Sequence, residues 1–370
     1  MFSAGHLLTS WAWKPASRSI AGKGERTAAG VRMQTGVSQS ALPAQPAGRL
    51  LTLAIATALI AASGAPGEAF AVGGWPGKPI RLVIPFAPGG SNDVLARLLA
   101  PRAGEALGQP LVIDNRAGAG GTLASELVAR AAPDGYTLIL VASTHAFALA
   151  MQGRNSFDPV RDFTAITLIG TSPLALVVHP QVAAKDAPEF VALARREAGR
   201  IAIGSGGMGS IGHLSIELLQ LVGGVKVTHV PYKGGGPVLA DLVAGHVQAS
   251  FLSLAAAAPQ IRAGRLRALA ITGAQRAPGF EPLPTFAEQG YKIRIEQWWG
   301  VLGPAGLAPA ITARVHAEFT RARATPEARE RLAELGVIPA DLAPEGFRRF
   351  LEREVADMVQ LVKTAGIRAE

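Results

Sequence analysis

From Lys78 onward, short apolar runs alternate with glycine-rich turns and longer amphipathic segments. A strand, a tight turn and a helix, repeated in this order, are typical of sheets built largely from parallel strands. The sequence therefore predicts an α/β fold. We expect its strands at 80–85, 110–114, 137–141, 164–169, 174–178, 200–203, 227–230, 248–252 and 266–271.

The length of 370 residues is comfortable for two lobes, each large enough to bury its own core. No strand is expected after Trp299 beyond the apolar run that follows it, so the last helices must pack on a sheet that is already built. We therefore expect two crossings between the lobes, near Ser172-Pro173 and at 296–300, and these crossings form a hinge. The predicted first lobe is 75–175 plus 297–370, and the second is 176–296. The last helices, each with a proline near its first turn, are predicted at 309–324, 326–335 and 344–365.

Composition excludes several chemistries. The chain has no Cys, so a disulfide, a thiolate metal site and a cysteine nucleophile are excluded. Its seven His include no pair four residues apart, the spacing of a helical zinc site, and we expect neither a metal nor a cofactor. The net charge of +9 comes from scattered basic residues without interleaved aromatic residues, so binding of nucleic acid is not expected.

The first 71 residues are typical of an export leader. Thirteen apolar or small residues at 50–62 follow Arg49. They are too few to cross a bilayer, which takes about 20 residues. The A-x-A pattern Ala69-Phe70-Ala71 comes next, as at a signal-peptidase site. The sequence therefore predicts a signal and leader segment at 1–71, cleavage after Ala71 and a periplasmic protein, with an uncleaved anchor or a buried helix as the alternative.

A glycine-rich turn joins the strand at 80–85 to a helix that opens near Ser91. Gly89 and Gly90 allow a tight turn, and the free N–H groups of the helix point outward with the positive end of its dipole. This first loop is therefore suited to binding an anion. Capping of the helix by Ser91 or Asp93 is the purely structural alternative.

A second turn of the same kind leads from the strand at 200–203 into another helix. Its Gly204, Gly206 and Gly209 also fit the G-x-G-x-x-G pattern of dinucleotide-binding loops. Such a loop further needs an acidic residue at the end of the next strand, about 20 residues on. The next strand is instead followed by Lys233, which would suit a 2′-phosphate, so an NADP-dependent oxidoreductase stays the alternative to an anion-binding loop.

A serine hydrolase is a weaker interpretation. Ser210, Asp241 and His246 occur in the chain order of a triad, but Met208 stands where the nucleophile elbow G-x-S-x-G has its first glycine. Asp241 and His246 are more simply the exposed face and the end of one helix. The sequence therefore favours a binding protein over an enzyme.

Longer segments resemble a known family. Three of them, WPGKPIRLVIPFAPGGSNDVLARLLA (75–100), GQPLVIDNRAGAGGTLASELVARAAPDGYTL (108–138) and VPYKGGGPVLADLVAGHV (230–247), are similar to the Bug family, the extracytoplasmic receptors of tripartite tricarboxylate transporters. The resemblance implies a type II periplasmic-binding-protein fold, in which two mixed sheets flanked by helices are joined by two crossing hinge strands. It also implies a monomeric receptor without catalytic residues. Such a receptor captures an amino acid, a di- or tricarboxylate or an aromatic acid, with membrane transporter subunits as further partners.

The resemblance also implies that backbone N–H groups and ordered waters hold the ligand carboxylate, as helix N-termini allow. Ile211 and Gly212 stand where members often have hydroxyl residues, so one hydroxyl contact is not expected here. Leu252 stands where members commonly have a polar residue, which favours a more apolar or aromatic ligand. His145 and His213 are either cleft residues or local packing residues. The positions carried over are Phe86, Pro88, Gly89, Gly90, Ser91 and Asp93 in the first loop, Ser143, Thr144 and His145 at a strand end, Ser205, Gly206, Gly209, Ser210 and His213 in the second loop, and Tyr232, Lys233 and Gly234 beside it.

Overall fold

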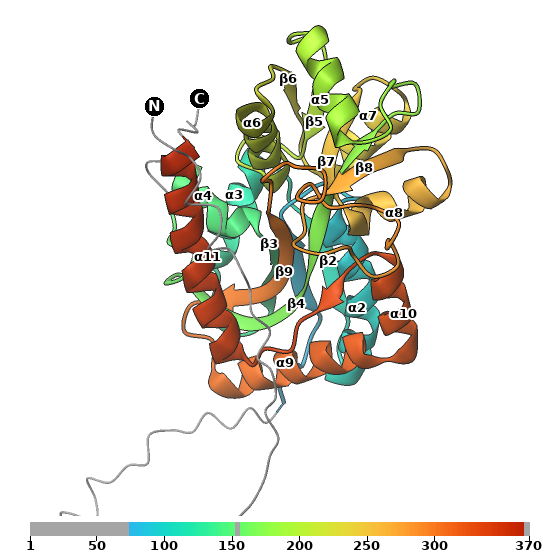
Figure 1. Ribbon diagram of the computed structural model, residues 1–370. Helices are drawn as coiled ribbons and strands as arrows, with labels where there is room; N and C mark the ends of the chain where they lie inside the picture. Colours follow the sequence, from blue (N-terminus) through green and yellow to red (C-terminus); the bar gives the residue numbers. More distant parts are fainter. Residues whose placement is uncertain (1–73, 152–155, 366–370) are drawn as a thin grey trace, which may run out of the picture. The chain divides into compact units, whose positions relative to one another are not determined.

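The computed structural model describes residues 74–151 and 156–365 (Figure 1). The predicted leader at 1–71, with its cleavage after Ala71, lies outside these residues. Strands and helices alternate along most of the described part, which confirms the α/β fold. Among the described helices, none combines the length and the apolar character that a membrane span requires.

A mixed sheet runs through the described residues in the order β2-β1-β3-β9-β4-β7-β5-β6. β1 is parallel to β2 and β3, whereas β9 is antiparallel to β3 and β4. Beyond β4, which is antiparallel to β7, strand β5 is parallel to β6 and β7. β8 and β10 pair with β4 outside this order. The strands are β1 (Ile80–Ile84), β2 (Leu111–Asn115), β3 (Thr137–Ala142), β4 (Phe163–Val178), β5 (Ala202–Ser205), β6 (Thr228–Pro231), β7 (Ala249–Ser253), β8 (Arg267–Ile271), β9 (Glu296–Pro304) and β10 (Ile338–Pro339).

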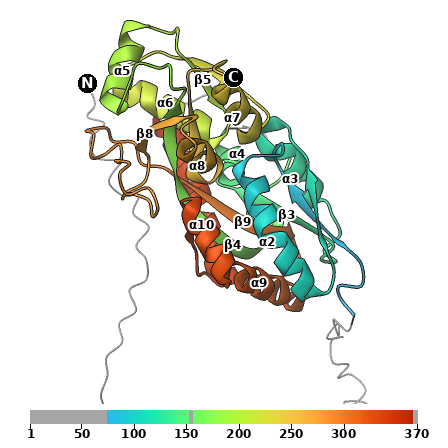
Figure 2. The ribbon, with the colours of Figure 1, turned by 90° about the vertical axis from the view of Figure 1, so that its right-hand side faces the viewer.

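β4 connects the two groups of strands (Figures 1 and 2). The prediction of separate strands at 164–169 and 174–178 is wrong, because both belong to β4. Pro173 lacks an N–H, but it is the last residue of β4 opposite β9, and pairing with β7 begins at Leu174, so the missing N–H falls at the boundary between two ladders. Leu174 N–H donates to Thr272 Oγ1 at 3.0 Å at this point.

The helices cover the sheet, and the three at the carboxyl end confirm their predicted positions to within one residue. α9 packs on α2 and β4, and α11 packs on α4 and β4 (Figures 1 and 2). The helices are α2 (Ser91–Leu107), the short 3₁₀ helix η1 (Ala119–Gly121), α3 (Thr122–Ala129), α4 (Thr144–Met151), α5 (Ala187–Arg196), α6 (Ile211–Gly223), α7 (Gly235–Val243), α8 (Leu254–Arg262), α9 (Pro309–Ala324), α10 (Pro326–Glu334) and α11 (Pro344–Ala365).

Two consecutive tryptophans of β9 anchor the core. Trp298 and Trp299 are fully buried. Trp298 meets Phe347 and Phe350 of α11 edge to face, with ring centroids 6.0 and 5.6 Å away. Trp299 Nε1 donates to the Ser91 hydroxyl at 3.2 Å. β9 therefore fixes α11 on one side and the start of α2 on the other.

Candidate ligand-binding site

A cavity of about 60 Å³ lies where the glycine-rich loops of both groups of strands meet. The N-terminal residues of five helices line it, those of α2, α4, α6, α7 and α8. None of the described residues that line it carries a charge. Six predicted site residues are among them: Phe86, Gly90, Ser91, Thr144, Gly206 and Ser210.

The positive ends of these helices attract an anion without help from Lys or Arg. In the described part of the chain, α2, α7 and α8 have no side-chain cap, so N–H groups of their first turns are left for a ligand. α6 is capped by Ser210 Oγ, which accepts from His213 N–H at 3.2 Å. The residues before His213 in this turn, Ile211 and Gly212, line the cavity.

Asp93 holds the first loop and does not line the cavity. Its Oδ2 accepts from Gly89 N–H at 3.0 Å and from Arg97 Nε at 2.9 Å, and its Oδ1 accepts from Asn115 Nδ2 at 3.2 Å. Burial raises the pKa of Asp93, but the hydrogen bonds from Arg97, Gly89 and Asn115 outweigh it, and the net pKa lies below the ordinary value. The carboxylate therefore stays charged near pH 7 and fixes the turn that presents Gly90.

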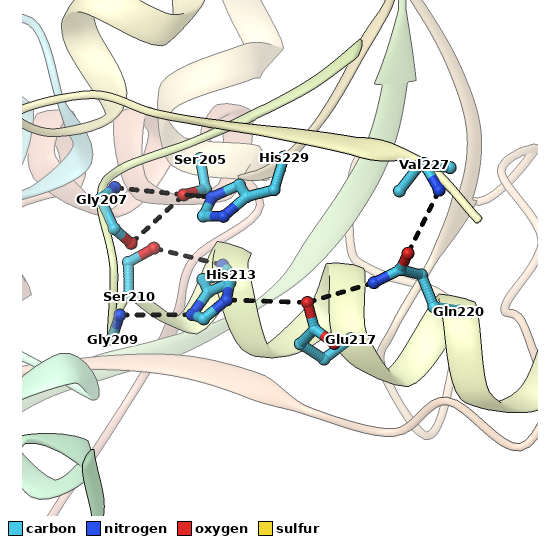
Figure 3. Close-up of polar contacts among 9 residues, drawn as sticks. All are labelled: Ser205, Gly207, Gly209, Ser210, His213, Glu217, Gln220, Val227 and His229. Atoms are coloured by element: carbon cyan, nitrogen blue, oxygen red, sulfur yellow. Dashed lines mark hydrogen bonds and ion pairs between the residues drawn. The ribbon is translucent and has the colours of Figure 1, made fainter. Parts of the chain in front are cut away.

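Polar contacts hold the second loop from behind (Figure 3). Gly209 N–H donates to His213 Nδ1 at 3.3 Å, and Ser205 Oγ lies 2.6 Å from His229 Nε2. The rings of His213 and His229 stack with centroids 4.5 Å apart. Burial, and secondly the neighbouring His213, lower the pKa of His229 to about 4, so His229 is neutral near pH 7. Ser205, Gly209 and His213 shape this loop and lie outside the cavity lining.

The three predicted residues after β3 point to different surroundings. Thr144 lines the cavity. Ser143 is fully buried, and its hydroxyl donates to Gln297 Oε1 at 3.2 Å. His145 Nε2 donates to Pro159 O at 3.0 Å, because a carbonyl oxygen only accepts. Burial lowers the pKa of His145 to about 4, so His145 is a neutral packing residue away from this cavity.

The segment Tyr232-Lys233-Gly234 lies beside the cavity without lining it. Tyr232 OH donates to Asp241 Oδ2 at 2.7 Å. Burial and this hydrogen bond raise the pKa of Tyr232 to about 12. The Lys233 side chain is exposed, and its carbonyl accepts from Ala87 N–H at 3.2 Å. A backbone hydrogen bond therefore joins this segment to the first loop.

Glycines make the contact between these loops close. A Cβ built on Gly236 would lie 2.1 Å from Pro88 O, and one built on Gly90 would lie 3.5 Å from Gly236 N. Likewise, a Cβ on Gly120 would lie 2.8 Å from Met208 O in the second loop. Main chain thus packs directly on main chain, and a methyl group at Gly236 would force the two segments apart.

Sequence reasoning missed the part of the lining that comes from the middle of the sheet. Leu252, which the sequence predicts to make the pocket less polar, lines the cavity. Other residues become neighbours only through the strand order β9-β4-β7, which no local pattern predicts. The lining residues missed in this way are Leu174, Phe251, Ser253, Ala256 and Gln297. Asn92 and Gly235 were also missed, although they stand directly beside the predicted Ser91 and Gly234.

The structure does not favour a dinucleotide at the second loop. A Cβ on Gly204 would lie 2.9 Å from the Val238 side chain, so Gly204 allows α7 to pack on β5.

A sequence model of the Tripartite tricarboxylate transporter family receptor, TctC, matches residues 95–367. The chain belongs to this receptor family. A relative within it is the protein BugT of Bordetella pertussis, which is 35% identical over 295 residues, 79% of this chain and 90% of BugT. The predicted resemblance to the Bug family is therefore confirmed.

Solved structures agree with TctC membership. R. palustris Rpa4515 with adipate has a TM-score of 0.76 and 36% identity, covering 80% of this chain and 99% of that one. MatC (Rpa3494) from Rhodopseudomonas palustris with bound malate has a TM-score of 0.75 and 33% identity, covering 78% of this chain and 100% of that one. The predicted periplasmic-binding-protein fold is thus confirmed, and TctC receptors are solute-binding proteins of the periplasm.

Proposed function

We propose that the chain is a periplasmic receptor that captures a small carboxylate in the cavity, for uptake or sensing. The observation that carries this proposal is the convergence of five helix N-termini on a cavity whose described lining residues bear no charge. A carboxylate that leaves water for this cavity exchanges its hydration for peptide N–H groups already oriented toward it. The arrangement therefore suits an anion better than a neutral or cationic ligand.

Two hydroxyl groups are positioned to support the peptide groups. Ser91 Oγ accepts from Trp299 Nε1, and Ser210 Oγ accepts from His213 N–H, both at 3.2 Å. Each hydroxyl hydrogen remains for a carboxylate oxygen. Leu252 adds an apolar wall, which suits the carbon chain of the ligand.

The lobes expected from the sequence, 75–175 plus 297–370 and 176–296, are proposed as the parts that close on the ligand. β4 supports this division, because it passes from one group of strands to the other. The first loop belongs to one proposed lobe and the glycines 234–236 to the other. We therefore expect this contact to form when the lobes close on the ligand.

The remaining features follow the family. We propose export with cleavage after Ala71, a monomer without enzymatic activity, and partnership with transporter membrane subunits. The ligand class is an amino acid, a di- or tricarboxylate or an aromatic acid. Malate in MatC and adipate in Rpa4515 support a small carboxylate, since both are dicarboxylates.

Calorimetry of the purified exported protein tests the proposal. Mono-, di- and tricarboxylates, amino acids and aromatic acids are titrated alongside their primary amides, which keep the shape and lose the charge. We expect at least one acid to bind with a Kd below about 1 mM, equivalent to roughly −4 kcal/mol, and its amide to bind far more weakly. Binding of NADP with no binding of any acid would refute the proposal.

A further inference from the structure

Gln297 of β9 lines the cavity, and its side chain is held by a hydrogen bond from outside the lining. Its side chain is buried, with 6% of the residue exposed, and it borders the cavity. Its Oε1 accepts the Ser143 hydroxyl at 3.2 Å. Ser143 is in turn held by its own N–H, which donates to Trp298 O at 3.1 Å. The amide oxygen is therefore occupied, and the amide is oriented by two neighbouring strands.

The amide nitrogen of Gln297 is left without an acceptor among the described residues. Thr144 and Ser253 are similar, because they are 5% and 6% exposed, line the same cavity and have hydroxyls that bond to no other described residue. We call Gln297, Thr144 and Ser253 the inner polar group. Because these polar atoms face the cavity, their hydrogen-bond partners come from the contents of the cavity, either water or a ligand.

Gln297 stands apart from the helix starts that are proposed to attract the carboxylate. Gln297 lies in β9, whereas Thr144 opens α4, Ser253 precedes α8, and Ser91 and Ser210 belong to the starts of α2 and α6. Both sets of residues line the same small cavity. One small molecule can therefore reach both sets of donors only if its second polar atom lies a few bonds from its carboxylate.

We propose that Gln297 determines specificity by donating its amide N–H to a second acceptor oxygen of the ligand, a hydroxyl, keto or second carboxylate oxygen close to the first carboxylate. This inference rests on the proposed function. Ser143 acts as a positioning residue, because it orients the Gln297 amide without lining the cavity. The apolar Leu252 offers no hydrogen bond to such an oxygen, so the choice among ligands falls to Gln297 and its neighbours.

Matched ligand pairs test the inference. Propionate is compared with lactate and pyruvate, and butyrate with succinate, by calorimetry on the wild type and on Gln297→Met. In the wild type, at least one oxygen-bearing acid should bind about tenfold more tightly than its plain partner, the effect of one well-formed hydrogen bond. Gln297→Met should bring that ratio close to one, because only the oxygen-bearing acid loses a hydrogen bond. The lactate and pyruvate arms and the succinate arm identify which oxygen is read.

Two further variants separate selection from folding. Ser143→Ala should lower the same ratio, because the amide is then free to turn. Gln248→Met removes a glutamine that accepts from Ala202 N–H at 2.8 Å outside the cavity, and it should leave the ratio unchanged. Thermal unfolding without ligand checks that each variant is folded. Equal weakening of both members of every pair in Gln297→Met would overturn the inference and leave the proposed function standing. Absence of any carboxylate binding to the wild type would instead refute the proposed function.

Discussion

Gly236→Ala tests whether the contact between the first loop and α7 is needed for capture. The added Cβ would lie 2.1 Å from Pro88 O, where ordinary contact begins at 3.4 Å, so the segments must separate. Overpacking of this kind costs about 1–3 kcal/mol, and the hydrogen bond from Ala87 N–H to Lys233 O, worth about 1 kcal/mol, is weakened with it. If the contact belongs to the ligand-bound arrangement, a loss of about 2 kcal/mol raises Kd roughly thirtyfold.

If the ligand-free protein is open and does not make this contact, the same substitution should not destabilise it. Gly236 has no positive φ and lies in the first turn of α7, where Ala favours the helix over Gly by up to about 1 kcal/mol. The melting temperature without ligand should therefore stay constant or rise while calorimetry shows the weaker Kd. Gly346→Ala is the matched control, because it lies in the first turn of α11 and its nearest neighbour is the Leu342 side chain at an ordinary 3.5 Å. A Kd of Gly236→Ala within twofold of the wild type would refute the reasoning.

Three smaller perturbations complete the set. Ser210→Ala should lower the free energy of unfolding by about 1 kcal/mol and raise Kd about threefold to tenfold, as read by denaturant titration and calorimetry; Ser215→Ala, whose hydroxyl donates to Ile211 O, should leave Kd unchanged. Because the pKa of Asp93 is lower in the folded chain than its ordinary 3.8, the carboxylate stabilises the fold above pH 3.8 and loses this effect as the pH falls through the pKa of the folded state. The free energies of unfolding of wild type and Asp93→Asn should therefore differ at pH 7 and converge in strong acid. A difference that is constant with pH would contradict this. Burial lowers the pKa of His145 from 6.5 to about 4, so between these pH values only the unfolded chain takes up a proton, and the free energy of unfolding falls as the pH decreases. In urea titrations, His145→Gln should show a shallower fall of the unfolding free energy over this pH range.

Much of the fold can be predicted because its signals are local. Apolar runs bounded by glycine or proline mark most strands, and proline in the first turn marks α9, α10 and α11. The prediction of two separate strands on either side of Ser172-Pro173 failed for a physical reason. Proline argues against a strand interior only while its N–H would have a partner, and the exchange of partners along β4 removes that need. Such an exchange depends on strands more than 70 residues away in sequence, as with Ser253 opposite Leu174.

The same distinction between local signals and distant contacts applies to the residues of the site. The loops were predictable, because a strand, glycines and a helix start follow one another directly in the chain. Direct lining by His145 and Asp93 could not be decided from sequence, since the direction of a side chain depends on partners such as Pro159 and Asn115. The sequence places Gln297 only in the predicted crossing between the lobes at 296–300. Its role depends on Ser143, 154 residues earlier, and no pattern in the chain links the two.

The helix starts around the cavity have a consequence for how such receptors diversify. Peptide dipoles belong to the main chain, so no single exchange of side chains abolishes the pull on an acid. The walls, such as Leu252 and Gln297, are free to vary beneath that constant attraction. A change of ligand therefore requires substitutions only among the side chains that contact the part of the ligand beyond its carboxylate, while the main-chain contacts to the carboxylate stay the same.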